Sequence, residues 1–236
     1  MSDLIDTTEM YLRTILELEE DGVVPMRARI VELLGQAGPT VSQTIARMQR
    51  DGLVELADDR SLRLTDEGRA RATAVLRRHR LAERLLVDVI GLDLHLVHAE
   101  ACRWEHVMSE EVERRVLALV SDPTVSPFGN PVPGLAALAE NAPTPADTPG
   151  AVAVRDLAVD GDATVVRFGE PLQSDHDLLS EVLGAGIDIG RTCHVATSLD
   201  GSRTVRGGIG SVVLREPLSR HLMVVPVAAP VASAAG

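Results

Sequence analysis

Three side chains that commonly ligate metals lie close together near the middle of the chain: Cys102, Glu105 and His106. The surrounding segment has helical spacing, and at about 100° per residue the three positions fall within about a 100° arc of one helix face. A thiolate, a carboxylate and an imidazole spaced i, i+3, i+4 can reach one ion. This mixed donor set favours Fe²⁺, Co²⁺, Ni²⁺ or Mn²⁺ over a closed tetrahedral zinc site.

A second group of donors precedes the first. His79 and Glu83 form an i, i+4 pair on an earlier predicted helix, and His98 lies one turn before Cys102. Four of the seven histidines fall within 28 residues: His79, His95, His98 and His106. A single helical histidine is more often a core or surface residue, but this concentration beside a cysteine predicts metal binding.

An enzymatic alternative exists for the same segment. Cys102–His106 has the pattern of a His-x-x-Glu-His protease motif with cysteine at the first ligand position. That motif needs a free glutamate base and an open water position, and no other part of the sequence supplies a substrate cleft. We therefore predict that the chain is not an enzyme.

The overall charge argues against a nucleic-acid partner. The 236 residues carry 35 acidic and 23 basic side chains, a net charge of −12, and every basic residue is arginine. The charge is uneven, however, because residues 26–80 hold eleven arginines against seven acids, a local net charge of +4. This short basic stretch predicts conditional binding to an anionic partner.

Other classes are excluded by composition. No apolar run approaches the roughly 18 residues that a membrane span needs, and residues 1–10 have three acids and no basic region typical of a secretory signal. Two cysteines in such a chain make no disulfide framework. We therefore expect a cytoplasmic protein with no membrane partner.

The elements that must position these residues are mostly helical up to residue 120. Periodicity predicts helices over 3–20, 26–34 and 39–50, then a hairpin from strands 53–56 and 62–64. Further helices are predicted over 65–90, 94–108 and 109–119. Gly35 and Pro39 give the turn between the second and third helices the spacing of a helix-turn-helix, and the hairpin is the expected wing.

In a winged helix-turn-helix the second helix of the motif enters the DNA major groove. Its predicted base-facing residues are Pro39, Thr40, Ser42 and Gln43. Phosphate contacts are expected from basic residues near it, with a further contact from the first helix: Arg27, Arg29, Arg47, Arg50, Arg60 and Thr7. A small helical bundle with a solvated arginine face is the alternative.

The C-terminal part has a different pattern. Apolar runs at 152–154, 164–168, 194–196 and 211–214 predict a small β-rich domain, with a short helix over 176–183. We expect domains over 1–73 and 74–140, a linker at 141–150, a third domain over 151–228 and a flexible tail at 229–236.

Five motifs in order resemble the iron-dependent diphtheria-toxin-repressor family. They are Asp6–Ile15, Gly38–Thr44, His79–Leu86, Glu100–Ser109 and Ser126–Pro131. The resemblance is dense over residues 1–135 and looser beyond. It implies a mainly α fold with α+β elements, in which a winged helix-turn-helix is followed by a helical metal-binding and dimerisation domain and an SH3-like β-barrel.

The resemblance also implies two metal sites per subunit. The primary site would contain Met10, Cys102, Glu105 and His106, and the ancillary site would contain His79, Glu83, His98, Glu170 and Gln173. Beside the ancillary metal an anion would be held by Arg80, Ser126 and Asn130. Ala37 departs from the family, in which a hydroxyl residue is common at this position of the turn.

These implications predict a homodimeric repressor that Fe²⁺ activates to bind inverted-repeat operators of iron-uptake and siderophore genes. Co²⁺, Ni²⁺, Mn²⁺ or Zn²⁺ would substitute in vitro, and the soft donors Met10 and Cys102 favour Fe²⁺ over Mn²⁺. The alternatives are a manganese-responsive repressor of the same fold and a metal-independent winged-helix regulator.

Overall fold

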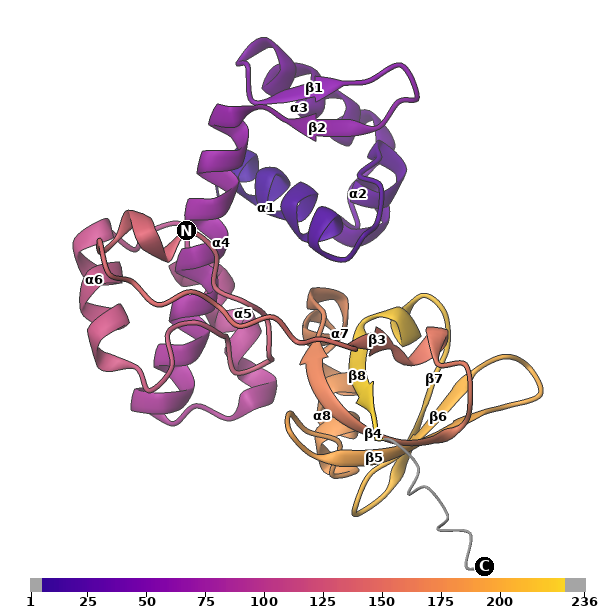
Figure 1. The fold of residues 1–236 in the computed structure, drawn as a ribbon. Coiled ribbons are helices and arrows are strands. Elements are labelled where there is room, and N and C mark those ends of the chain that lie inside the picture. The colour runs from indigo at the N-terminus through magenta and orange to yellow at the C-terminus, as the bar shows by residue number, and fades with distance from the viewer. Residues whose placement is uncertain (1–5, 228–236) are drawn as a thin grey trace, which may run out of the picture. The chain divides into compact units, whose positions relative to one another are not determined.

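The computed structural model describes residues 6–227 and divides the chain into two compact units, residues 1–146 and 147–236. The first unit is helical apart from one hairpin, and the second is built on a sheet (Figure 1). This agrees with the fold class expected from the sequence. The predicted start of the first helix at Asp3 and the tail at 229–236 lie outside the described residues.

The first unit begins with a winged helix-turn-helix. Its elements are α1 (Thr7–Glu20), α2 (Arg27–Leu34), α3 (Gly38–Arg50), β1 (Val54–Leu56) and β2 (Leu62–Leu64). β1 and β2 pair in antiparallel register, with Val54 opposite Leu64. The apolar faces of the three helices and the hairpin share one core, which contains Tyr11, Ile15, Ile45 and Met48.

The helix ends follow local chemistry. The side chain of Asp6 caps α1 by accepting from the backbone N–H groups of Thr8 and Glu9. Gly35 ends α2 with φ of 61°, a left-handed conformation that suits glycine. Ala37 precedes α3 and supplies no side-chain cap.

The long helix α4 joins the winged part to the rest of the unit. The elements that complete the unit are α4 (Asp66–Leu85), the π-helix η1 (Leu86–Ile90), α5 (Leu94–Trp104), α6 (Glu110–Leu119) and η2 (Leu135–Ala137). α4 packs against α1, α5 and α6. At its start a Cβ on Gly68 would lie 1.9 Å from the Leu53 carbonyl oxygen, so only glycine allows this close approach to the hairpin.

The second unit contains a six-stranded antiparallel sheet in the order β3-β8-β4-β5-β6-β7. Its elements are β3 (Val152–Ala153), η3 (Val154–Asp156), β4 (Gly161–Phe168), α7 (Glu170–Ser174), α8 (His176–Gly184), β5 (Thr192–Thr197), β6 (Arg203–Arg206), β7 (Ser211–Leu214), η4 (Leu218–Arg220) and β8 (Leu222–Pro226). This sheet is consistent with the expected SH3-like domain.

Side chains alternate between the two faces of that sheet. Cys193 and Val195 are buried on β5, whereas Thr192 and His194 between and beside them are exposed. Burial raises the pKa of Cys193 to about 11, so this cysteine is a protonated core residue. Among the described residues, no helix is both long enough and apolar enough to cross a membrane.

Candidate functional site

A buried cluster of titratable side chains forms where α4 packs on α5. His79 and Glu83 are one turn apart on α4, and the structure buries both completely. Nε2 of His79 lies 2.9 Å from Oε1 of Glu83, and Nδ1 of His98 on α5 lies 3.4 Å from the same oxygen. The sequence-predicted donors His79, Glu83 and His98 are therefore brought together.

His79 also connects this group to the other predicted site. Its Nδ1 lies 2.6 Å from Oε2 of Glu105, so each ring nitrogen faces a carboxylate. Burial opposes the charged form of His79, but the charges of Glu83 and Glu105 outweigh it and raise the pKa of His79 well above its ordinary value. Both ring nitrogens of His79 are therefore within hydrogen-bonding distance of a carboxylate oxygen.

Cys102 lies at the same junction. Its Sγ is 3.6 Å from Nε2 of His98. Burial raises the pKa of a thiol, but the nearby cations Arg13, His98 and His79 lower that of Cys102 well below its ordinary value. The thiolate, the form that ligates metals, is therefore favoured here.

These groups fit a divalent transition metal. Ligand atoms of His79, His98 and Cys102 all lie within 4.8 Å of one another. In the described part of the chain the second oxygen of Glu83, Oε2, is buried and has no hydrogen-bond partner. An acceptor left in this state inside a protein is costly, and a cation would satisfy it. Sulfur, nitrogen and oxygen donors in one buried cluster form a divalent-metal site.

The remaining predicted primary ligands are arranged differently from the helical expectation. α5 ends at Trp104, so Glu105 is its C-cap and His106 lies in the turn beyond, and the prediction that the helix continues to Met108 was wrong. The turn nevertheless keeps the two side chains together, because Nε2 of His106 lies 3.2 Å from Oε1 of Glu105. Met10 is half-buried on α1 and packs against the core of the winged part.

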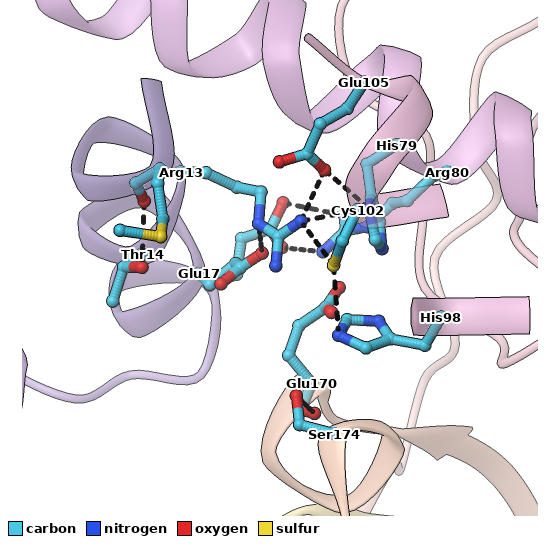
Figure 2. Close-up of polar contacts among 12 residues, drawn as sticks. Arg13, Thr14, Glu17, His79, Arg80, His98, Cys102, Glu105, Glu170 and Ser174 are labelled. Atoms are coloured by element: carbon cyan, nitrogen blue, oxygen red, sulfur yellow. Dashed lines mark hydrogen bonds and ion pairs between the residues drawn. The ribbon is translucent and has the colours of Figure 1, made fainter. Parts of the chain in front are cut away.

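Two residues of α1 that the sequence reasoning missed contact this cluster. Nη1 of Arg13 donates to Oε2 of Glu105 at 2.5 Å and to Sγ of Cys102 at 3.6 Å, and Figure 2 shows Arg13 extending toward both. Oε2 of Glu9 lies 2.7 Å from Nδ1 of His106. Glu9 is adjacent to Met10 in the sequence, and Arg13 follows it by one helical turn. Their closeness to a predicted ligand is the one sequence signal that pointed to a role at the metal site.

The predicted anion-binding residues also lie together. Arg80, Ser126 and Asn130 are all buried. The guanidinium of Arg80 makes a two-pronged ion pair with Glu20, with distances of 3.1 and 2.6 Å, and also donates to the carbonyl oxygen of Pro131. The carboxylate of Glu20 is therefore paired with the Arg80 guanidinium, the group that was expected to bind an external anion.

The predicted DNA-facing residues form the solvent side of α3. Val41, Thr44, Ile45 and Met48 of this helix are buried. Its exposed positions include Pro39, Thr40, Ser42, Gln43, Arg47 and Arg50. Thr7, Arg29 and the wing residue Arg60 are exposed as well, whereas Arg27 is half-buried and Arg29 pairs with Glu32. Most of the side chains expected to contact DNA are thus accessible, on α3 and on segments near it in sequence.

In the second unit, Glu170 and Gln173 lie one turn apart on the short helix α7. Nε2 of Gln173 donates to the carbonyl oxygen of Phe168 at 2.7 Å, so its amide orientation is fixed by the end of β4. The two side chains start on the same side of a helix.

Two family models match the first unit. Residues 3–62 match "Iron dependent repressor, N-terminal DNA binding domain", and residues 65–134 match "Iron dependent repressor, metal binding and dimerisation domain". The boundary between the two matches falls at Thr65, the cap of α4, where the winged part ends.

Curated proteins are similar over most of the chain. The "Iron-dependent repressor IdeR" of Mycobacterium tuberculosis is 54% identical over 207 residues, which cover 87% of this chain and 90% of that protein. The "Diphtheria toxin repressor" of Corynebacterium diphtheriae is 51% identical over 226 residues, covering 95% and 99%.

Solved structures share the fold. A "Manganese-dependent transcriptional repressor complex with manganese" has a TM-score of 0.76 and 27% identity, covering 94% of this chain and all of that one. The crystal structure of T. acidophilum IdeR has a TM-score of 0.72 and 25% identity, covering 93% and 97%.

Proposed function

Because the chain belongs to the iron-dependent repressor family, we propose that Fe²⁺ is the metal that activates it to bind inverted-repeat operators of iron-uptake and siderophore genes. As a member of that family it is a DNA-binding, metal-dependent transcriptional repressor and not an enzyme. We place its action in the reducing cytoplasm, where Cys102 stays a free thiol.

The observation that carries the proposal is that α1 contacts both the ligand cluster and the DNA-reading helix. Toward the cluster, Arg13 binds Glu105 and Glu9 binds His106. Toward DNA, the Tyr11 hydroxyl donates to Oε1 of Gln36 in the turn before α3, at 2.5 Å. A change of ligand contacts on one side of α1 therefore changes the support of α3 on the other.

We assign Met10, Cys102, Glu105 and His106 to the primary site. A divalent ion would supply positive charge that neutralises the thiolate of Cys102 and the carboxylate of Glu105. It would also link these two groups to Met10 on α1. The soft sulfur donors Met10 and Cys102 select Fe²⁺ over Mn²⁺. The residues then hold α1 against the end of α5, and the state competent for DNA is selected from the existing ensemble.

The ancillary site is a second proposal. We propose His79, Glu83 and His98 as its donors, and the family resemblance adds Glu170 and Gln173 as further ligands. Glu83 Oε2, buried without a hydrogen-bond partner among the described residues, supports a ligand role for that residue. We assign the neighbouring anion site to Arg80, Ser126 and Asn130.

For DNA, we propose that Pro39, Thr40, Ser42 and Gln43 face the bases. The remaining contacts, mostly to phosphates, are assigned to Thr7, Arg27, Arg29, Arg47, Arg50 and Arg60. Exposure of Gln43 supports its role, since a glutamine amide can pair with adenine through two hydrogen bonds. Arg47 also reaches back to the Thr8 hydroxyl of α1, 3.4 Å away, which ties a phosphate-contacting residue to the helix that senses the cluster.

The repressor is a homodimer in this proposal, with the interface on the dimerisation domain. That part of the chain exposes several large apolar side chains that a monomer would leave in water: Val89, Ile90, Leu96, Val107, Val112 and Leu119. A two-fold dimer presents two copies of α3, which matches an inverted-repeat operator.

The decisive experiment measures binding to a candidate operator duplex across a series of Fe²⁺, Co²⁺, Mn²⁺ and Zn²⁺, and without metal. We expect tight binding with Fe²⁺ or Co²⁺ and weak binding without metal. Equal affinity with and without metal would favour a metal-independent regulator, and tighter binding with Mn²⁺ than with Fe²⁺ would favour a manganese-responsive one. Met10→Ala should keep the fold and abolish the metal response.

A further inference from the structure

Arg13 brings a fixed positive charge into the ligand cluster. Its side chain is nearly fully buried, and its Nη1 contacts Oε2 of Glu105 at 2.5 Å, Nδ1 of His79 at 2.9 Å and Sγ of Cys102 at 3.6 Å. The Nε atom of Arg13 lies 2.8 Å from Glu17, which helps to hold the side chain in this direction. One guanidinium nitrogen therefore faces three groups that can each ligate a metal (Figure 2).

The lone pairs of Glu105 and Cys102 that accept from Arg13 are the ones that a metal would use. An oxygen of Glu105 that accepts a short charge-assisted hydrogen bond from Arg13 has less electron density to offer a cation. A guanidinium cannot lose its proton in a protein, so its charge is removed only by movement of the side chain. The guanidinium of Arg13 and a metal ion would therefore compete for the carboxylate of Glu105 and the thiolate of Cys102.

Resting on the proposed function, we infer that Arg13 is an internal counter-cation of the primary site, which the metal must displace from Glu105 and Cys102. In the metal-free protein it compensates the buried negative charge and holds the donors together. Its displacement opposes metal binding, so Arg13 sets the metal concentration at which the repressor switches. Because Arg13 belongs to α1, the same displacement moves a contact of the helix that supports α3.

The test compares Co²⁺ binding by the full-length wild-type protein and by its Arg13→Gln and Arg13→Lys variants. Binding is monitored by the absorption of the Co²⁺–thiolate centre. Arg13→Gln removes the charge, and we expect it to bind Co²⁺ at least about tenfold more tightly. Arg13→Lys keeps the charge, and its affinity should stay near that of the wild type. Arg69→Gln is the matched control, because it removes an α4–α1 ion pair with Glu19 outside the ligand cluster.

Thermal unfolding gives a second readout that does not depend on DNA. In EDTA, Arg13→Gln should melt at a lower temperature than the wild type, since the buried Glu105 carboxylate loses one of its two cationic partners. The rise in melting temperature on adding Co²⁺ should be larger in the variant. If Arg13→Gln does not fold, Arg13→Met keeps the apolar stem and makes the same comparison.

The outcomes separate this inference from the proposed function. If wild-type protein binds Co²⁺ through thiolate but Arg13→Gln binds with equal or weaker affinity, the counter-cation role is wrong and the metal-dependent repressor stands. If wild-type protein gives no Co²⁺–thiolate absorption, the primary site itself is wrong. Equal losses of melting temperature with and without Co²⁺ would mean that Arg13 is only structural.

Discussion

Glu9 on α1 and His106 beyond α5 are 97 residues apart in sequence, yet a carboxylate oxygen of Glu9 lies 2.7 Å from Nδ1 of His106. The other oxygen of Glu9 accepts from Nη2 of Arg78 on α4 at 2.9 Å. Glu9 therefore links α1, α4 and the turn after α5 at the edge of the metal cluster. With Nδ1 engaged, Nε2 is the nitrogen of His106 that is directed toward Glu105.

We predict that Glu9→Gln weakens metal binding. A carboxylate that accepts from the distal nitrogen of a ligating histidine fixes its tautomer, and its loss typically reduces metal affinity by about 10- to 100-fold. Co²⁺ affinity measured by titration should fall by about tenfold or more. Glu19→Gln, which removes only the ion pair with Arg69, is the control. An unchanged affinity in Glu9→Gln would exclude an orienting role.

Tyr11→Phe should separate metal binding from DNA binding. The substitution removes only the hydroxyl that donates to Gln36, and the ring stays in the core of the winged part. The free energy of unfolding should fall by about 1 kcal/mol. Co²⁺ affinity should not change, while operator affinity of the metal-bound protein, measured by fluorescence anisotropy, should drop severalfold. A parallel loss of metal affinity would place Tyr11 in the ligand cluster instead.

Arg60→Gly tests the wing. Arg60 has φ of 67°, a left-handed conformation that a non-glycine residue adopts at some cost. Glycine relieves that strain, so thermal stability should stay the same or rise slightly while the charge is lost. Operator binding should weaken, with the slope of log affinity against log salt reduced by about 1. An unaltered slope would mean that Arg60 makes no phosphate contact.

Ala37→Ser should stabilise the DNA-reading helix. Ala37 is the N-cap of α3, its backbone is extended, and it offers no side-chain hydrogen bond. A serine hydroxyl at this position can accept from the first turn, which is worth about 1 kcal/mol. Urea unfolding should show this gain, and Ala37→Val should show none. A serine variant no more stable than the valine variant would contradict the capping argument.

The acid sensitivity of the metal-free protein should depend on Glu105. Burial opposes ionisation of this carboxyl, but Arg13 and His79 outweigh it and hold its pKa at about 2, below the ordinary 4.5. A lowered pKa gives stability that is complete above about pH 4.5 and is lost as the pH falls toward 2. In EDTA, the wild type should exceed Glu105→Gln by about 3 kcal/mol at pH 6 and by less than half of that at pH 3. A difference independent of pH would refute this account.

Local sequence signals predicted most of the helices and strands. The elements and helix ends that they did not predict depend on contacts between residues far apart in the sequence. Hydrophobic periodicity and punctuating residues such as Gly35 placed α2, α3 and the wing, but apolar residues continue past Trp104 and so hid the end of α5. The chain must reverse there to enter α6, which begins after the Ser109 cap. Strands β6 and β8 and helix α7 were not anticipated, because their short segments have no clear period of their own.

The candidate ligands were predictable because donor residues at helical spacing are visible in one segment. Arg13 and Glu9 were not, since their roles arise only when α1 packs against residues about 90 positions away. Their types also gave no warning, because a charged residue on an amphipathic helix is usually solvated. The assignment of Met10 as a ligand came from family resemblance and is a prediction that the Met10→Ala experiment tests.

The close packing of the first turn of α4 against the start of the hairpin couples the position of the hairpin to that of the ligand end of the helix. Thr65 and Gly68 fix its first turn to Gly52 and Leu53, and a continuous helix leads from there to His79 and Glu83. At 1.5 Å per residue, the span from Thr65 to Glu83 is about 27 Å. A tilt of about 5° at the ligand end would therefore carry the hairpin by about 2 Å. Small changes in the positions of the buried ligands would thus move the hairpin by a larger distance. A displacement of this size is enough to make or break a hydrogen bond between the wing and a DNA phosphate.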